Sequence, residues 1–215
     1  MKKWSIALVL LFCGMYLFAQ SLFDLVETGT PEQVQAAIRA GAKLDDRDEL
    51  FGMTPLMRAA QYNENPAVIT TLLNAGAKLD DRDEDGVTPL ILAASFNKNP
   101  EVITTLLNAG AKVDDRDYYG WTPLMFAASF NKNPDVITTL LNAGARLDDR
   151  DKNGMTPLMY AAKYNENPEV ITTLLNARAD AKAKSIDGKT AFDYAQNNPK
   201  IKGTKAYWDL NNARF

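Results

Sequence analysis

A block of nine residues recurs every 34 residues, and this spacing limits the folds open to the chain more than any other feature. Copies of the block begin at Gly52, Gly86, Gly120 and Gly154, and a weaker copy begins at Gly188. A second block, NPEVITTLLNAGAKVDDRD at 99–117, recurs in phase with the first. A unit of this length cannot bury its apolar face alone and does so by stacking on its neighbours. The repeat therefore predicts one solenoid.

Each unit carries the start and stop signals of two helices. Thr54 before Pro55 and Asn65 before Pro66 each combine a capping side chain with a proline suited to the first helical position. Gly76 supplies a left-handed stop for the second helix. Between the helices lies a turn, Tyr62-Asn63-Glu64-Asn65 in the first copy, in which we expect asparagine to adopt the left-handed conformation. The unit is thus predicted to be a short helix, a turn and a longer helix.

These motifs, G-x-T-P-L-x-x-A-A, then V-I-x-x-L-L-x-x-G-A and a D-x-x-G turn, resemble the ankyrin repeat over nearly all of residues 21–215. The resemblance implies an all-α ankyrin-repeat solenoid of about six helix-turn-helix units, with the DDRD segments projecting as short β-hairpin fingers. The expected organisation is a signal peptide at 1–20, an N-terminal capping repeat at 21–51, ankyrin repeats at 52–85, 86–119, 120–153 and 154–187, and a C-terminal capping repeat at 188–215.

Two departures from the ankyrin pattern carry expectations of their own. The histidine that usually follows T-P-L is absent, so apolar packing has to replace its hydrogen bonds; its place is taken by Met57, Ile91, Met125, Met159 and Asp193. Arg178 stands where the other copies have a stop glycine. A left-handed non-glycine residue costs about 1 kcal/mol, so we expect the fifth repeat to end differently.

The first twenty residues are typical of a signal peptide, because Lys2 and Lys3 precede the uncharged, largely apolar run 4–20. We expect cleavage after Gln20 and export to the periplasm or the extracellular space of a bacterium. Retention of the segment as a membrane anchor, or lipidation at Cys13, stays open as an alternative. Without the segment, 22 basic residues face 27 acidic ones, a net charge of −5.

Composition excludes several kinds of chemistry. The chain has no histidine, and its only cysteine lies in the predicted signal peptide, which excludes nucleophilic triads and zinc sites built from those residues. The net charge of −3 has the wrong sign for a nucleic-acid partner. Residues 81–86 and 149–154 imitate half of a calcium loop, but Leu92 and Tyr160 occupy the place of its essential glutamate. We expect no catalytic residue, metal or cofactor.

Recurring acidic pairs such as Asp80-Asp81 and Asp114-Asp115 are expected to align as a ridge, interleaved with one arginine per repeat. Two interpretations are open: a self-neutralised ladder that holds the fingers in order, or a docking surface for a basic partner. Individual exposed ion pairs are weak, which favours the ladder.

Positions that vary between copies are the candidates for recognition, and by resemblance to ankyrin domains they lie on finger tips and on the concave face. They are Glu49, Leu50, Phe51, Met53, Glu84, Asp85, Val87, Tyr118, Tyr119, Trp121, Lys152, Asn153 and Met155. The three aromatic residues at 118–121 are the strongest candidates, because tyrosine and tryptophan are enriched at binding hot spots. A recurring aromatic strip is open to two interpretations, packing or contact: Tyr62, Phe96, Phe130 and Tyr164.

The sequence therefore predicts a monomeric, non-catalytic module that binds a protein partner on its fingers and concave face. The alternative is a small-ligand or metal-binding protein, or an enzyme, that uses acidic finger residues. A closed pocket with convergent carboxylates would favour the alternative, and a long shallow groove would favour protein binding.

Overall fold

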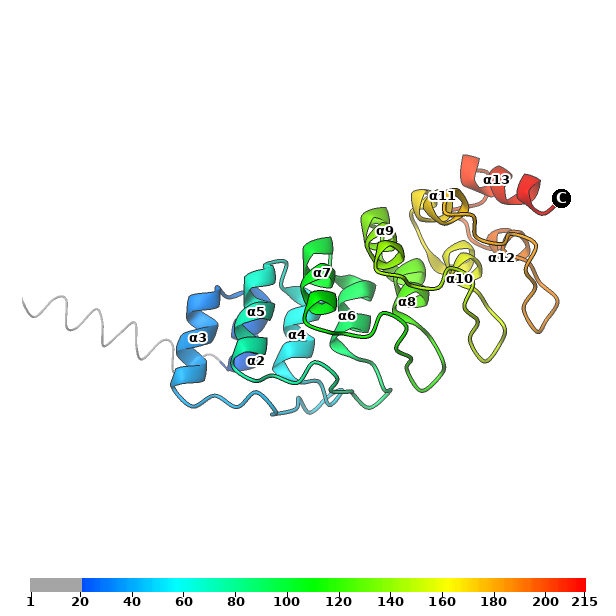
Figure 1. Cartoon of the computed structure of the whole chain (residues 1–215). Helices are drawn as coiled ribbons and strands as arrows, with labels where there is room; N and C mark the ends of the chain where they lie inside the picture. The colour runs from blue at the N-terminus through cyan, green and yellow to red at the C-terminus, as the bar shows by residue number, and fades with distance from the viewer. Residues whose placement is uncertain (1–20) are drawn as a thin grey trace, which may run out of the picture.

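The computed structural model describes residues 21–215, so the predicted signal peptide and Cys13 lie outside the described residues. Within this range the chain forms twelve helices and no β-strand, and none of these helices is long and apolar enough to span a bilayer. Figure 1 shows them as stacked pairs in one elongated array. The helices are α2 Leu22–Thr28, α3 Pro31–Arg39, α4 Pro55–Tyr62, α5 Pro66–Asn74, α6 Pro89–Phe96, α7 Pro100–Asn108, α8 Pro123–Phe130, α9 Pro134–Asn142, α10 Pro157–Tyr164, α11 Pro168–Asn176, α12 Ala191–Ala195 and α13 Lys205–Ala213.

In neighbouring pairs, first helix packs against first helix and second helix against second helix. The first helices, α2, α4, α6, α8, α10 and α12, contact one another in that order and form one layer. The second helices, from α3 to α13, form the other layer in the same order (Figure 1). Because each unit packs mainly against its two neighbours, the chain is an all-α solenoid, as the repeat predicts.

The predicted helix boundaries are confirmed at the capping side chains. The Thr122 hydroxyl accepts a hydrogen bond from the backbone N–H of Met125 at 3.3 Å, and the Asn133 side chain accepts one from Asp135 at 3.0 Å. Pro123 and Pro134 occupy the first helical positions, where a missing N–H costs nothing. Gly144, with φ of 94°, ends the second helix. The capping residues and prolines recur in each of the four central repeats, and the stop glycine recurs in three of them.

The expectation for the inter-helix turn is wrong. Asn131 and Asn133 have φ of −80° and −90°, and Arg178 is the only non-glycine residue in 21–215 with a positive φ. Asn131 is instead buried, and its side chain donates to the backbone of the preceding repeat. The turn asparagine therefore serves a contact between repeats and not a left-handed bend.

The expected change at the end of the fifth repeat is also wrong. Arg178 keeps the left-handed conformation, with φ of 71°. Its N–H donates to Leu175 at 2.9 Å and the N–H of Ala179 donates to Leu174 at 3.0 Å, as in the repeats that carry glycine. The two hydrogen bonds and the stacking of the next pair outweigh the local strain of about 1 kcal/mol.

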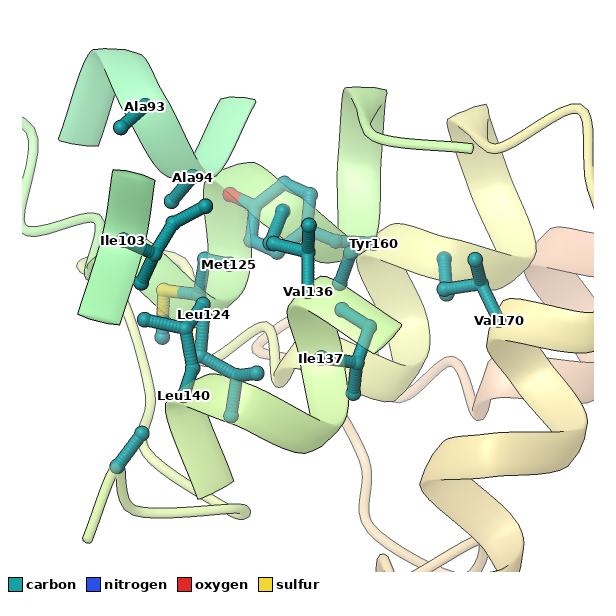
Figure 2. Close-up of a cluster of buried hydrophobic side chains, with 14 of the residues drawn as sticks. Ala93, Ala94, Ile103, Leu124, Met125, Val136, Ile137, Leu140, Tyr160 and Val170 are labelled. Atoms are coloured by element: carbon teal, nitrogen blue, oxygen red, sulfur yellow. The ribbon is translucent and has the colours of Figure 1, made fainter. Parts of the chain in front are cut away.

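One apolar cluster runs through the whole array, from Leu22 in α2 to Leu210 in α13. Its middle part, shown in Figure 2, brings together Ala93 of α6, Leu124 of α8 and Ile137 of α9, all fully buried. Small alanines let the first helices approach closely, and the branched residues of the second helices fill the space behind them. This continuous seam is what ties the repeats into one body.

Apolar packing replaces the missing histidines, as expected. Met57, Ile91 and Met125 are fully buried. In the last copy, Asp193 instead accepts a hydrogen bond from the backbone N–H of Thr190 at 2.8 Å and closes a capping box. The apolar residues therefore fill the histidine position by packing, and Asp193 fills it by hydrogen bonding.

The segments that join one pair to the next project from one side of the array (Figure 1). We call these segments the first to fifth fingers: residues 45–53, 80–87, 114–121, 148–155 and 182–189. Each is a tight turn, in which, for example, Asp83 N–H donates to Val87 at 3.1 Å, and no strand pair forms in the described residues. Other backbone groups of this turn bond to side chains: the Gly86 carbonyl accepts from Arg82, and the Val87 N–H donates to the Asp83 carboxylate.

Candidate functional site

Each central finger is shaped by an aspartate that folds back on its own backbone. In the third finger, Asp117 accepts hydrogen bonds from the N–H groups of Tyr119 at 3.0 Å and Trp121 at 2.7 Å. Asp83 and Asp151 do the same in the second and fourth fingers. This arrangement turns residues 118 and 119 outward, where each tyrosine is 60% exposed, and directs the tryptophan toward the helices.

Arginines connect successive fingers. Arg82 donates to the carbonyl of Gly86 in its own finger at 2.6 Å, to the carbonyl of Arg116 in the next finger at 2.8 Å, and to the carboxylate of Asp115 at 2.6 Å. Arg116 repeats these contacts one unit later, with Asp149 as its acid. These contacts support the ladder, the first of the two interpretations of the acidic ridge, because each of these arginines pairs with one acid of the next finger.

A hollow of about 450 Å³ opens between the fingers and the first helices. We call it the central hollow. Its walls are largely aromatic, and no basic residue is among the described residues that line it: Asp85, Val87, Asp117, Tyr119, Trp121, Phe126, Phe130 and Asn153. It belongs to an open groove and not to a closed cavity, which is the geometry that favours a polypeptide ligand over a small molecule.

Stacked rings form the floor of the central hollow. The Trp121 ring lies with its centroid 4.0 Å from that of Tyr160, 5.1 Å from that of Phe126 and 6.3 Å from that of Phe130. Phe130 in turn stacks on Phe96 at 6.2 Å. Such offset and tilted pairs stabilise one another, so Trp121 is a rigid part of the surface.

The aromatic strip is both packed and accessible. Its four side chains lie in succession along the groove, one at the end of each first helix, and between 44% and 49% of each is exposed: Tyr62, Phe96, Phe130 and Tyr164. Stacking between Phe96 and Phe130 shows the packing interpretation, while half of each ring remains open to contact. The two interpretations therefore describe two faces of the same side chains.

Three of the predicted contact residues are buried. Met53 and Val87 pack with Met57 and Ile91 in a second apolar cluster under the fingers, and Met155 belongs to the main seam. Of the three, only Val87 reaches the wall of the central hollow. The other predicted finger residues are exposed: Glu49, Leu50, Phe51, Glu84, Asp85, Tyr118, Tyr119, Lys152 and Asn153.

Tyr118 also has a structural role. Its ring lies over Gly86 so closely that a Cβ atom built on this glycine would come within 2.7 Å of Tyr118 Cδ1. The Tyr118 N–H donates to Asp85 at 3.1 Å, and the ammonium of Lys152 donates to the Tyr118 carbonyl at 2.7 Å. Tyr118 thus links three fingers while its ring stays accessible, and Tyr119 is the freer of the two tyrosines.

Sequence reasoning missed Asp117, Phe126 and Tyr160 as part of this surface. Phe126 and Tyr160 occupy the fourth position of a first helix, which varies between copies as the finger tips do, so the same criterion would have found them. Asp117 recurs in most copies, and only its surroundings distinguish it. No motif in the sequence indicates those surroundings.

Burial changes the ionisation of the finger aspartates. It raises the pKa of Asp117 and of Asp83, and the nearby charge of Asp85 adds to both effects, although backbone hydrogen bonds oppose them. Burial, followed by the hydrogen bond to Asp151, raises the pKa of the Tyr160 hydroxyl. The central fingers therefore hold carboxylates whose charge is costly without a cation nearby.

The acids at the base of the fingers are engaged by arginine rather than by one another. Asp81 lies 3.6 Å from Arg47, and Asp149 lies 2.7 Å from Arg116. Residues 21–215 contain no group of three or more acidic residues placed to hold a metal ion. The partial calcium-loop pattern of the sequence thus corresponds to ladder contacts in the fold.

The fold defines a helical-repeat protein whose fingers and first helices border an open, aromatic groove. A family model described as ankyrin repeats, in three copies, matches residues 22–117, 59–151 and 97–187. The chain belongs to the ankyrin repeat family, whose members are generally protein–protein interaction modules and typically non-enzymatic scaffolds. No curated protein matches the chain.

Proposed function

We propose that this chain is a non-catalytic binding module that holds one protein partner on the surface formed by Tyr119, Trp121 and the central hollow. The observation that carries the proposal is the exposure of Tyr119 beside an aromatic-walled hollow. Large aromatic side chains are costly to leave in water, and no framework contact of the repeat demands a tyrosine at this position. Tyrosine and tryptophan next to a concave surface are typical of a binding hot spot.

Site-specific photocrosslinking in the native organism tests this proposal. A photoreactive phenylalanine analogue replaces Tyr119 in one variant and Thr104, which is exposed on α7 in the second-helix layer, in the control. We expect a discrete crosslinked protein from position 119 that is absent from position 104. Identical products from both positions, or no product from position 119, would refute a partner at the groove.

A double substitution gives the quantitative arm. Trp121→Ala removes the floor of the hollow and Tyr119→Ala removes the exposed ring, and together they should weaken partner binding by at least about 100-fold, as expected for two hot-spot residues. Trp208→Ala, on α13 in the second-helix layer and 54% exposed, is the matched control that removes a large side chain elsewhere. Equal losses from the two changes would place the hot spot elsewhere.

We also propose that the chain works outside the cytoplasm, on the strength of the charged start and apolar run at 2–20. Cell fractionation followed by N-terminal sequencing tests this. Mature protein that begins at Ser21 supports the proposal, whereas protein recovered only from the cytoplasm with Met1 in place opposes it. An intact, membrane-bound chain would indicate an anchor.

A further inference from the structure

The fourth residue of a first helix stands next to the shaping aspartate of the finger before it. In the second repeat Arg58 donates to Asp48 at 3.0 Å, and in the fifth repeat the Tyr160 hydroxyl donates to Asp151 at 2.7 Å. Thus the chain supplies its own donor to the finger carboxylate in these two repeats.

In the third and fourth repeats this donor is missing. The fourth helix residues are Leu92 and Phe126, and no side chain of residues 21–215 donates a hydrogen bond to Asp83 or Asp117. Only 8% of Asp117 is exposed, and it opens on the central hollow. Asp117 is therefore a buried carboxylate that only backbone N–H groups contact, with no side-chain donor.

The aromatic rings show the same division between the ends and the middle of the array. The guanidinium carbon of Arg58 lies 5.9 Å from the ring centroid of Tyr62, and the ammonium of Lys163 lies 4.7 Å from that of Tyr164. For Phe130 and Trp121, between these ends, the part of the chain that the structure describes offers no cation. The terminal rings of the strip are occupied by the protein's own cations, and the central rings are open.

We propose that the central hollow receives a single cationic side chain, an arginine in preference to a lysine, from the protein partner. This inference rests on the proposed function. The hollow joins the buried carboxylate of Asp117 and the exposed carboxylate of Asp85 to the rings of Trp121 and Phe126. The charge and the π-faces both favour a cation, and none is supplied from within residues 21–215.

Arg58 shows how such a side chain is held. It bonds Asp48 at 3.0 Å and Glu27 at 3.1 Å while its guanidinium lies over Tyr62. A partner's guanidinium in the central hollow bonds Asp117 and Asp85 in the same way and packs against Phe126. Arginine suits this place better than lysine, because a planar guanidinium stacks on rings and forks onto carboxylates while an ammonium is strongly hydrated.

Peptide libraries test the inference with the purified full chain. Three immobilised libraries of nine-residue peptides carry random flanks and a fixed central arginine, citrulline or glutamate, where citrulline keeps the shape of arginine without its charge. We expect the arginine library to bind at least about tenfold more strongly than the citrulline library, the ratio of one charge-assisted contact. Equal binding to both would overturn the inference.

Four variants locate the effect. Asp117→Asn and Asp85→Asn should each reduce the preference for arginine over citrulline. Asp45 is an exposed acid of the first finger, so Asp45→Asn is the control for net charge and should leave the preference unchanged. Phe126→Arg places a guanidinium where Arg58 stands in its own repeat, fills the hollow from within and should abolish the preference. Circular dichroism confirms that each variant folds.

The outcomes separate this inference from the function on which it rests. One outcome would overturn the cationic site and leave the groove function intact. In it, Trp121→Ala abolishes peptide binding, but the native chain binds the libraries equally whatever their central charge. A preference for arginine that survives Asp117→Asn, Asp85→Asn and Phe126→Arg would also overturn the site. Absence of binding from all three libraries overturns it too, and the Tyr119 crosslink then decides the proposed function.

Discussion

Asn131 donates a hydrogen bond through its side-chain amide to the backbone carbonyl of Asn97, one repeat earlier, at 2.8 Å. The same amide bonds Ala94 at 3.0 Å, and its carbonyl oxygen accepts from the N–H of Asn133 at 2.9 Å. The arrangement recurs along the array at Asn63, Asn97, Asn165 and Asn198. A chain of buried amides thus fixes the spacing of the repeats at the turn, as the arginine ladder does at the fingers.

Loss of one amide in this chain should be costly. Asn131→Ala leaves the carbonyls of Ala94 and Asn97 buried without their donor, and we expect the free energy of unfolding to fall by about 2–3 kcal/mol, given the usual cost of unsatisfied buried groups. Urea denaturation followed by circular dichroism measures this. Asn142→Ala, an exposed asparagine at the end of α9, is the control. Equal effects would show that Asn131 contributes no more than helix propensity.

Relief of the strain at Arg178 should stabilise the array. Arg178 is the one non-glycine residue with positive φ in the described chain and is exposed, so Arg178→Gly should raise the free energy of unfolding by about 1 kcal/mol. Gly144→Ala is the converse control, because nothing lies within 4 Å of a Cβ atom at Gly144 and only the backbone geometry is tested. It should destabilise by a similar amount, and thermal denaturation detects both shifts.

The Tyr160 hydroxyl is the internal partner of a finger carboxylate, so its removal should weaken the fold and create a further repeat without this donor. Tyr160→Phe leaves Asp151 with one side-chain donor, Asn153 at 3.1 Å, and should lower the free energy of unfolding by about 1–2 kcal/mol. Phe126→Tyr is the reverse change, since the new hydroxyl lies where it can bond Asp117. If Phe126→Tyr left arginine-peptide binding untouched, the donor at this position would have no bearing on the hollow.

Opposite pH dependences are expected for two finger aspartates. Burial raises the pKa of Asp117, so the folded chain holds this proton up to a higher pH than the unfolded chain, whose value is about 3.9. Its contribution to stability therefore increases as the pH falls through the raised value. Accordingly, the stability of the native chain relative to Asp117→Asn should grow between neutral pH and about pH 4.

Asp48 provides the control of opposite sign. Burial would raise the pKa of Asp48, but hydrogen bonds from Phe51 and Arg58 outweigh it and lower the pKa. Its contribution is fully present above the unfolded value and is lost as the pH falls through the folded value. Denaturation curves of Asp48→Asn should therefore converge on those of the native chain in acid. The same trend for both variants would contradict these assignments.

The sequence predicted what depends on local chemistry. Thr122-Pro123, Asn133-Pro134 and Gly144 determine helix ends through their own backbone and side chains, so the order and bounds of the helices followed directly. The inter-helix asparagines were misinterpreted because a local turn and a bond to the preceding repeat use the same residue. Asn131 makes both a local bond, to the N–H of Asn133, and bonds to the preceding repeat, and only the stacked array shows the latter.

The site was predictable to a lesser extent. Tyr119 and Trp121 were identified from variation against a constant framework, and their role in binding stays a prediction. Met53, Val87 and Met155 also vary but are buried, and variation alone does not separate buried from exposed positions. Asp117 lacks a side-chain donor because Phe126, in the next repeat, carries no hydroxyl. This relation involves two repeats, so the sequence of one repeat does not indicate it.

The fourth position of the first helix thus bears on the finger before it as well as on the core, to which Tyr160 and Leu92 belong. Arginine or tyrosine there supplies a donor to the finger carboxylate, and leucine or phenylalanine supplies none. A duplication of the 120–153 unit would add a further open repeat in register with the others. Such an array would distinguish partners by the interval between their basic residues, and its reach would grow in steps of one repeat.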